Sequence, residues 1–285
     1  MNYVLFNHLS NNGGGEARAD ALFTSLGVKA DDADYKKIDL VGLDIAEWMK
    51  GVTSEDLIYL VSGDGTLNRI ANDLYDTEVP CPMLLISGGT GNDFLKDIVE
   101  NYPSEGYTDV REYIKGLPTI KVNGKECHFL NGIGYGIDGM CCEVADKKKA
   151  EGKEKIDYTA LTINLLMFHY KCPTATVTID DGEEKVYEKT WLASTMNGRY
   201  YGGGMKVAPE QDRKGDGLTF VIWHGSGKVA TLAAFPSIFK GEHVKKTKMI
   251  TVIPAKKVKV KFDIPTAMQI DGDTVLNVSE YEAWK

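Results

Sequence analysis

Two glycine-rich segments, each directly after an apolar run, carry the residue types of a phosphate site. The run at 57–61 is followed by SGDGT at 62–66, and the run at 83–86 is followed by SGGTGND at 87–93. A glycine-rich turn between a strand and a helix brings backbone N–H groups close to a ligand, and the helix N-terminus favours negative charge. The pattern predicts one nucleotide site shared by two loops on successive strands.

The polar side chains of these loops also have structural alternatives. Asp64 either interacts with magnesium or orders its own loop, and its place on a solvent-facing turn suggests that its replacement leaves the fold intact. Asn92 and Asp93 either contact the ligand or cap the following helix. The threonine hydroxyls at 66 and 90 can donate hydrogen bonds to phosphate.

The elements that must position these loops alternate between strands and helices up to about residue 118. The expected elements are a strand at 3–6, a polar glycine-rich loop at 7–15, a helix at 16–26 ended by Gly27, a strand at 35–38 and a helix at 45–49. This order predicts a mostly parallel sheet with helices on both faces, in which ligands bind at the carboxyl ends of the strands. We therefore expect residues 1–120 to form a Rossmann-like nucleotide-binding α/β domain.

Beyond residue 118 the pattern changes to short alternating runs separated by turn pairs such as Asn-Gly and Asp-Gly. The expected elements are a hairpin at 174–179 and 184–190, strands at 218–223, 258–262 and 268–270, and helices at 158–170 and 228–239. This pattern of short strands and turns predicts that residues 121–285 form an antiparallel β-sandwich domain. On local grounds alone, Asp271-Gly272 between two apolar runs is a hairpin turn.

A lysine-rich segment and the helix before it have two interpretations each. Eight lysines lie between Lys240 and Lys261, against one acid, Glu242. They are either the solvent face of a strand or a patch attracted to an anionic membrane. The apolar residues of the helix at 228–239 either dock in the core, which we favour, or lie at a membrane interface.

Composition excludes some classes of function. The chain has 285 residues and a net charge of −8, which argues against a general nucleic-acid binder. Its five cysteines include no CxxC pair, as expected for thiols in a reducing cytosol. No signal peptide is visible and no apolar run approaches the roughly 18 residues of a membrane span. We expect a cytoplasmic protein that contacts membranes only peripherally, at their surface.

Five motifs together resemble one family, the diacylglycerol-kinase-type lipid kinases of the soluble bacterial branch, which are similar to sphingosine kinases and more distantly to NAD kinases. The motifs are SGDGTLN at 62–68, SGGTGNDF at 87–94, GYGID at 134–138, YGGG at 201–204 with AP at 208–209 and DGL at 216–218, and IDGD at 270–273. They occur in the family's order and cover most of the chain. The first motif alone is shared with NAD kinases.

The resemblance implies ATP as donor, Mg2+ as cofactor, and transfer of the γ-phosphoryl group to a hydroxyl of a lipid such as diacylglycerol, a step of phospholipid biosynthesis, in a cleft between the two domains. The implied nucleotide-binding residues are Asn7, Ser62, Gly63, Asp64, Gly65, Thr66, Asn68, Gly89, Thr90, Gly91, Asn92 and Asp93. Asp64 would organise magnesium in the catalytic centre, and Asp93 is a second candidate for this role.

The resemblance also implies roles in the second domain. Asp271 matches the family's proposed general base and Asp273 its partner carboxylate. An aspartate of ordinary pKa, near 4, is ionised at neutral pH and can accept a proton. Arg213, Asp216 and Leu218 match a site for a structural cation, with main-chain oxygens from Arg213 and Leu218.

The chain departs from the family's pattern at several positions, and two alternatives stay open. Ser62 replaces a glycine, Arg69 a glutamate, Asp273 a glutamate and His8 a proline. One alternative is an NAD kinase, disfavoured because no Asn-Glu pair occurs in the chain. The other is a catalytically weak lipid- or nucleotide-binding regulatory protein on the same fold. The expected partners are a lipid substrate and a peripheral membrane surface, with no nucleic acid, and a homodimer is one open oligomeric state.

Overall fold

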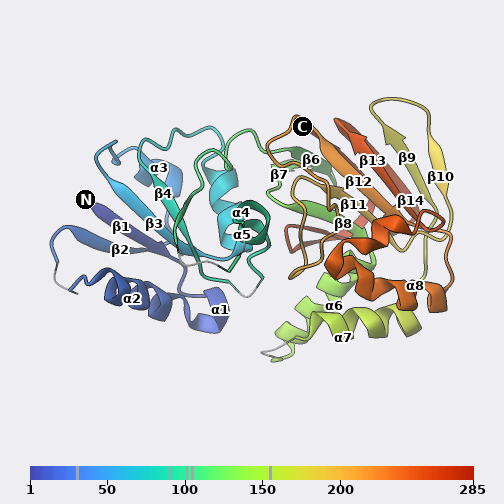
Figure 1. Cartoon of the computed structure of the whole chain (residues 1–285), viewed down its shortest axis with the longest axis horizontal. Helices are drawn as coiled ribbons and strands as arrows, with labels where there is room; N and C mark the ends of the chain where they lie inside the picture. Colours follow the sequence, from blue (N-terminus) through green and yellow to red (C-terminus); the bar gives the residue numbers. More distant parts are fainter. Residues whose placement is uncertain (30–31, 90, 101, 104–105, 154–155) are drawn as a thin grey trace. The chain divides into compact units, whose positions relative to one another are not determined.

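The computed structural model describes residues 1–29, 32–89, 91–100, 102–103, 106–153 and 156–285. The chain divides into two compact units, Met1–Leu117 and Pro118–Lys285. This division lies three residues before the domain boundary expected after residue 120. Each unit has its own sheet and its own buried core, and Figure 1 shows the elements of both.

In the described part of the first unit, five strands form a sheet in the order β2-β1-β3-β4-β5. The strands are β1 (Asn2–Phe6), β2 (Tyr35–Asp39), β3 (Leu57–Ser62), β4 (Met83–Ser87) and β5 (Thr108–Asp109). The first four are parallel and β5 is antiparallel to β4. β3 is an almost continuous apolar run that is buried along its length, as in strands covered on both faces. The predicted mostly parallel sheet is confirmed.

The helices of this unit are α1 (Ser10–Gly13), α2 (Gly15–Leu26), α3 (Ile45–Met49), α4 (Asp64–Asp73) and α5 (Asp93–Ile98). The chain moves from β1 to β2 in one direction and from β2 to β3 in the other. Right-handed crossovers therefore place α2 and α3 on opposite faces of the sheet (Figure 1). Gly27 ends α2 in the left-handed conformation, as predicted. The loop expected at 7–15 differs from the prediction because it contains the short helix α1.

The strand order reverses between β1 and β3, which lie side by side. In sheets of this kind, ligands bind outside the carboxyl ends of the strands at such a reversal. The loops that follow β1 and β3 both start at this edge. The topology therefore brings the first loop and the first glycine-rich loop together, although Asn7 and Ser62 are 55 positions apart in the sequence.

The described residues of the second unit form ten antiparallel strands in one hydrogen-bonded sheet that encloses a core. Eight follow the order β13-β12-β11-β8-β14-β15-β6-β7, and β9 pairs with β14 and β10. The strands are β6 (Thr119–Val122), β7 (Lys125–His128), β8 (Gly132–Gly136), β9 (Ala175–Ile179), β10 (Lys185–Tyr187), β11 (Leu192–Met196), β12 (Leu218–Trp223), β13 (Ile250–Ala255), β14 (Lys257–Ile270) and β15 (Asp273–Trp284).

One long strand replaces two that we predicted separately. The segments 258–262 and 268–270 both belong to β14, which pairs with β9 in its first part and with β8 in its last. Register shifts between Lys261 and Met268 allow this bend. The bend lets a single sheet fold over its own core, which gives the predicted sandwich-like unit.

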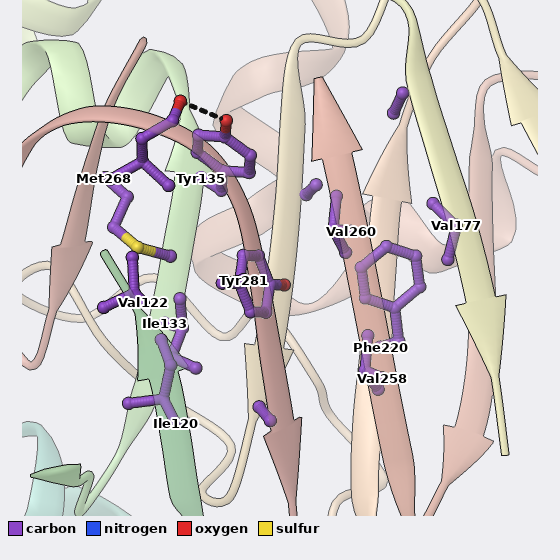
Figure 2. Close-up of a cluster of buried hydrophobic side chains, with 14 of the residues drawn as sticks. Ile120, Val122, Ile133, Tyr135, Val177, Phe220, Val258, Val260, Met268 and Tyr281 are labelled. Atoms are coloured by element: carbon purple, nitrogen blue, oxygen red, sulfur yellow. Dashed lines mark hydrogen bonds between the residues drawn. The ribbon is translucent and has the colours of Figure 1, made fainter. Parts of the chain in front are cut away.

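Figure 2 shows this core, where Tyr135 and Tyr281 lie among aliphatic side chains such as Val260 and Ile133. Buried tyrosines normally need a partner for the hydroxyl. Tyr135 donates to the carbonyl of Val278 at 2.6 Å, and the Tyr281 hydroxyl bonds that of Thr195 at 2.8 Å. The sheet can therefore bury both rings without leaving a polar group unsatisfied.

Helices cover one side of this sheet over a second apolar core (Figure 1). They are α6 (Ile137–Ala150), α7 (Tyr158–Asn164) with the π-helix η1 (Leu165–His169), α8 (Lys228–Ala234) with the 3₁₀-helix η2 (Phe235–Lys240), and η3 (Glu242–Lys245). Phe235 and Ile238 are buried in that core, which confirms the core interpretation for those side chains. Two strand lysines lie near acids: Lys257 is 2.7 Å from Glu282, and Lys259 is 3.9 Å from Glu280.

Candidate active site

The two glycine-rich loops are packed backbone against backbone. The Gly88 N–H donates to the Ser62 carbonyl at 2.8 Å and so extends the pairing of β3 with β4. A Cβ on Gly63 would lie 2.9 Å from the Cα of Gly89, and one on Gly89 would lie 2.8 Å from the Cα of Gly63. No side chain fits at either position without parting the loops. The glycines therefore serve close approach, and the loops form one structural unit at the sheet edge.

Asp64 connects the start of α4 to the start of α5. Its carboxylate accepts hydrogen bonds from the backbone N–H groups of Asp93 and Phe94, both at 2.9 Å. These are N–H groups of the first turn of α5, which have no acceptor within their own helix. Asp64 thus orders both loops, in agreement with the loop-ordering alternative, and these bonds lead us to expect that its replacement lowers stability, contrary to the prediction that the fold stays intact. Each oxygen keeps a lone pair with which it can contact a cation.

Asn92 closes the second loop instead of capping α5. Its backbone is left-handed (φ 50°), which asparagine tolerates better than most residues. Its side-chain oxygen accepts from the Gly89 N–H at 3.2 Å, and its amide donates to the Gly89 carbonyl at 2.8 Å. The capping alternative for Asn92 is therefore not observed, because Asp64 supplies the cap. Thr90 lies outside the described residues.

Asn7 brings the first loop to the same place. Its amide donates to the Thr66 hydroxyl at 3.3 Å, and its side-chain oxygen accepts from the Leu9 N–H at 3.0 Å. Gly15, the first residue of α2, lies against the Asn7 carbonyl. A Cβ on Gly15 would be 1.9 Å from that carbonyl oxygen, so only glycine fits there. Asn68, by contrast, is buried within α4 and accepts from the amide of Asn72.

Sequence reasoning missed Arg18 of α2. Its guanidinium donates to the Ser87 carbonyl at 3.1 Å, which places a fixed positive charge at the carboxyl end of β4. In the sequence Arg18 is one polar residue on an amphipathic helix, so no local pattern marks it. Its position follows only from the packing of α2 beside the end of β4.

In the second unit, Asp271 and Gly272 form the two-residue turn between β14 and β15. Both have positive φ (48° and 96°), as the predicted hairpin turn requires. The Asp271 carboxylate accepts from three successive backbone N–H groups, those of Leu130, Asn131 and Gly132, the last two at 2.7 and 3.0 Å. The carboxylate therefore ties the turn to the start of β8.

The electrostatic surroundings of Asp271 differ from the expectation of an ordinary carboxyl. Burial raises its pKa to about 6, although the three N–H groups and the nearby Arg213 favour the ionised form. Arg213 is itself buried, and it donates to the side-chain oxygen of Asn131 at 2.7 Å. The side chain of Arg213 thus braces the segment that holds Asp271.

Asp273 stands in a different environment two residues later. It begins β15, opposite Ile270, and is exposed. Among the described residues no hydrogen bond or ion pair to its carboxylate is found. Partial desolvation, and then the charge of Asp146, raise its pKa above the usual value. Asp273 is therefore the carboxylate of the IDGD motif that a substrate can reach.

A buried hydrogen-bonded network joins two further motifs. Tyr201, from the YGGG segment, donates to the Asp138 carboxylate at 2.7 Å and also bonds the Ser194 hydroxyl at 2.7 Å. Burial raises the pKa of Asp138 to about 6. Gln269 also bonds Asp138, and its side-chain oxygen accepts from the Gly272 N–H at 2.7 Å. The network thus reaches the turn that carries Asp271.

Lysine ammonium groups contact two of the oxygens expected to bind a structural cation. Lys256 lies 2.9 Å from the exposed Asp216 carboxylate, and Lys285 donates to the Arg213 carbonyl at 2.7 Å. Leu218 begins β12 and pairs with Ala255. Within the described ranges no cluster of three or more His, Cys, Asp or Glu is placed for a metal. A divalent cation bound to these oxygens would have to displace both lysines, so the cation site stays a prediction.

Two family descriptions match the chain along almost its whole length. Residues 2–120 match the "Diacylglycerol kinase catalytic domain", and residues 131–280, more than half of the chain, match the "YegS C-terminal NAD kinase beta sandwich-like domain". The chain belongs to the diacylglycerol-kinase-type family. The resemblance drawn from the five motifs is thereby confirmed.

Relatives of this family share moderate sequence similarity and the whole fold. Proteins of Staphylococcus aureus strains JH9 and N315, each named "Putative lipid kinase", are 26% identical over 233 residues, which cover 78% of this chain and 72% of theirs. Two Bacillus anthracis str. Sterne structures, titled as a putative diacylglycerol kinase and a diacylglycerol kinase, align over all of this chain and over 92% and 94% of their own. Their TM-scores are 0.66 and 0.62 at 20% and 22% identity.

Proposed function

We propose that this protein is an ATP- and Mg2+-dependent kinase that transfers the γ-phosphoryl group to a hydroxyl of a lipid such as diacylglycerol. The observation that carries the proposal is the close packing of Gly63 on Gly89, with Asp64 fastening both loops at the reversal of strand order. Because Gly63 and Gly89 carry no side chains, backbone N–H groups near them can approach a phosphate group closely. Membership of the diacylglycerol-kinase-type family supports the reaction class.

The first unit supplies the phosphate-binding groups. The first N–H groups of α4 have no intrahelical acceptor, and the Thr66 hydroxyl is held beside them by Asn7. Asp64 would hold magnesium with the lone pairs that α5 leaves free. When bound, the ion would offset the charge of the phosphates. The two loops would then position the γ-phosphoryl group, which is most of what phosphoryl transfer requires of a protein.

The second unit supplies the proton acceptor, and the contacts favour Asp273 over Asp271 for that role. The Asp271 carboxylate already accepts three N–H groups, which suits it to hold the turn. Asp273 is exposed and its pKa is raised, so it is a slightly stronger base than an ordinary aspartate. In the proposed step the lipid oxygen bonds to the γ-phosphorus, its proton passes to Asp273, and ADP leaves.

Purified protein with Mg2+-ATP tests the proposal against its alternatives. Diacylglycerol in detergent micelles should yield phosphatidate with loss of one ATP per product, and NAD in place of the lipid should yield no NADP. Formation of NADP would favour the NAD kinase alternative. ATP binding without turnover on diacylglycerol and a panel of other lipids would favour a regulatory binding protein.

A further inference from the structure

The helix made by α7 and η1 has an uncharged outer face. Residues 158–170 contain no Asp, Glu, Lys or Arg, although such residues make up 26% of the chain. The side chains of Ile163, Met167 and Phe168 are 39%, 40% and 64% exposed, while Leu165 and Leu166 face the core. A surface helix of a globular protein normally carries charged and polar residues on its outer side. This outer face instead carries large apolar side chains.

A second uncharged helix lies against it. Residues 229–239, in α8 and η2, also contain no charged side chain, and Val229 is 82% exposed. The Lys228 ammonium donates to the Met167 carbonyl at 3.0 Å, which joins the start of α8 to η1, and Figure 1 shows α7 and α8 side by side. Ile163, Met167, Phe168 and Val229 therefore form one surface, here called the apolar helix face.

Lysines border the apolar helix face. Lys228 and Lys189 both lie near enough to Cys172 to oppose the rise in its thiol pKa, which burial raises to about 11, and Lys171 is adjacent in the chain. All three lysines are exposed. We call this border of the apolar helix face its rim. The rim also includes one acid, Glu188, next to Lys189 in the chain. Asp157 lies at the far end of α7, where it caps the helix. The rim is thus positive in a protein whose net charge is −8.

We infer that the apolar helix face docks the protein on an anionic membrane surface. The apolar side chains enter the boundary between headgroups and acyl chains, and Lys171, Lys189 and Lys228 contact lipid phosphates. Interfacial helices bind by this combination of buried apolar area and attraction to anionic lipid. Among the described residues, no helix is long and apolar enough to cross a bilayer.

This inference rests on the proposed function, because an enzyme that phosphorylates a bilayer lipid must reach it at the membrane surface. A second protein chain is the weaker candidate for the occupant. A stable protein interface buries about 800 Å² on each side, whereas this face consists of four apolar side chains with a charged rim. A positive rim also gives a preference for anionic lipid that a purely apolar contact would not.

Sedimentation of the full chain with vesicles tests the docking face. Vesicles of phosphatidylcholine mixed with phosphatidylglycerol should bind the protein more tightly than phosphatidylcholine alone. Changing Met167→Ser together with Phe168→Ser should lower the partition coefficient about tenfold or more. Lys171→Glu with Lys228→Glu should abolish the preference for anionic vesicles. Leu276→Ser is the matched control, because Leu276 is 50% exposed on β15, outside the face, and should leave binding unchanged.

Kinase assays distinguish a wrong assignment of the docking face from a wrong proposal for the function. The Met167/Phe168 variant should phosphorylate diacylglycerol in vesicles more slowly than the parent protein does. With a dispersed short-chain diacylglycerol, the two proteins should have equal rates. Equal vesicle binding by the parent and this variant would overturn the docking face even if lipid is phosphorylated. Vesicle binding that depends on the face, without turnover of any lipid, would overturn only the proposed function. A shift from dimer to monomer in light scattering would assign the face to a second copy of the chain instead.

Discussion

Asp64 caps a helix to which it does not belong: its carboxylate accepts the backbone N–H groups of Asp93 and Phe94, at the start of α5. Asp64, the residue of this motif expected to organise magnesium, thus also has a structural role. One side chain fastens the loop after β3 to the loop after β4. Any change at Asp64 should therefore alter both the stability of the first unit and its affinity for nucleotide.

Asp64→Ala should lower the free energy of unfolding by about 2 kcal/mol, because two charge-assisted hydrogen bonds to buried N–H groups are lost. It should also weaken Mg2+-ATP binding. Chemical denaturation and calorimetry measure the two effects. Asp73→Ala, at the exposed end of α4, is the control and should change neither. An unchanged denaturation midpoint for Asp64→Ala would show that the cap contributes nothing.

Gly89→Ala should part the two loops, since its Cβ would lie 2.8 Å from the Cα of Gly63. Such overpacking costs about 1–3 kcal/mol of stability and should reduce ATP affinity with it. The matched change Gly65→Ala places a Cβ in open space in the first turn of α4, where alanine is the better helix former. Its melting temperature should equal or exceed that of the parent. Equal melting temperatures for the two variants would contradict the packing argument.

The variants Asp271→Asn and Asp273→Asn should distinguish the residue that stabilises the turn from the residue that accepts the proton. At position 271 an amide NH2 would face at least one of the three N–H donors, so the variant should lose about 1–3 kcal/mol of stability. At position 273 the fold should be unaffected, but the rate of single-turnover lipid phosphorylation should fall about 10²-fold or more. If the single-turnover rate of Asp273→Asn lies within a few-fold of the parent rate at full ATP occupancy, Asp273 is not the base.

The pH dependence of stability should reveal the buried Asp138, whose pKa of about 6 lies above the unfolded value near 3.9. The folded state therefore holds this proton more tightly than the unfolded chain does. The stability that this proton confers is complete below pH 4 and is lost as pH rises through 6. Relative to Asp138→Asn, which cannot ionise, the parent should lose on the order of 2 kcal/mol between pH 4 and 7. A constant difference between the two proteins across this range would show that Asp138 does not titrate in the folded state.

Local sequence patterns were sufficient for many of the elements and for the family. The apolar run before Ser62, the glycine after α2 and the Asp271-Gly272 turn could be read from neighbouring residues, because strand propensity, helix ends and tight turns are set largely by local sequence. The five motifs identified the family for the same reason, since each keeps its residues at fixed spacing. The single strand β14 was not predictable, because its bend depends on pairing with two different partners.

The assignment of roles within the motifs required the tertiary structure. That Asp64 caps α5, that Arg18 reaches the end of β4 and that Asp271 binds three N–H groups near residue 131 are contacts between segments far apart in the chain. Sequence spacing determines which residue types are present in a loop. The packing of the loops determines which of their carboxylates are used to hold the backbone and which remain accessible to substrate, because a carboxylate that already accepts several N–H groups has fewer lone pairs left for chemistry.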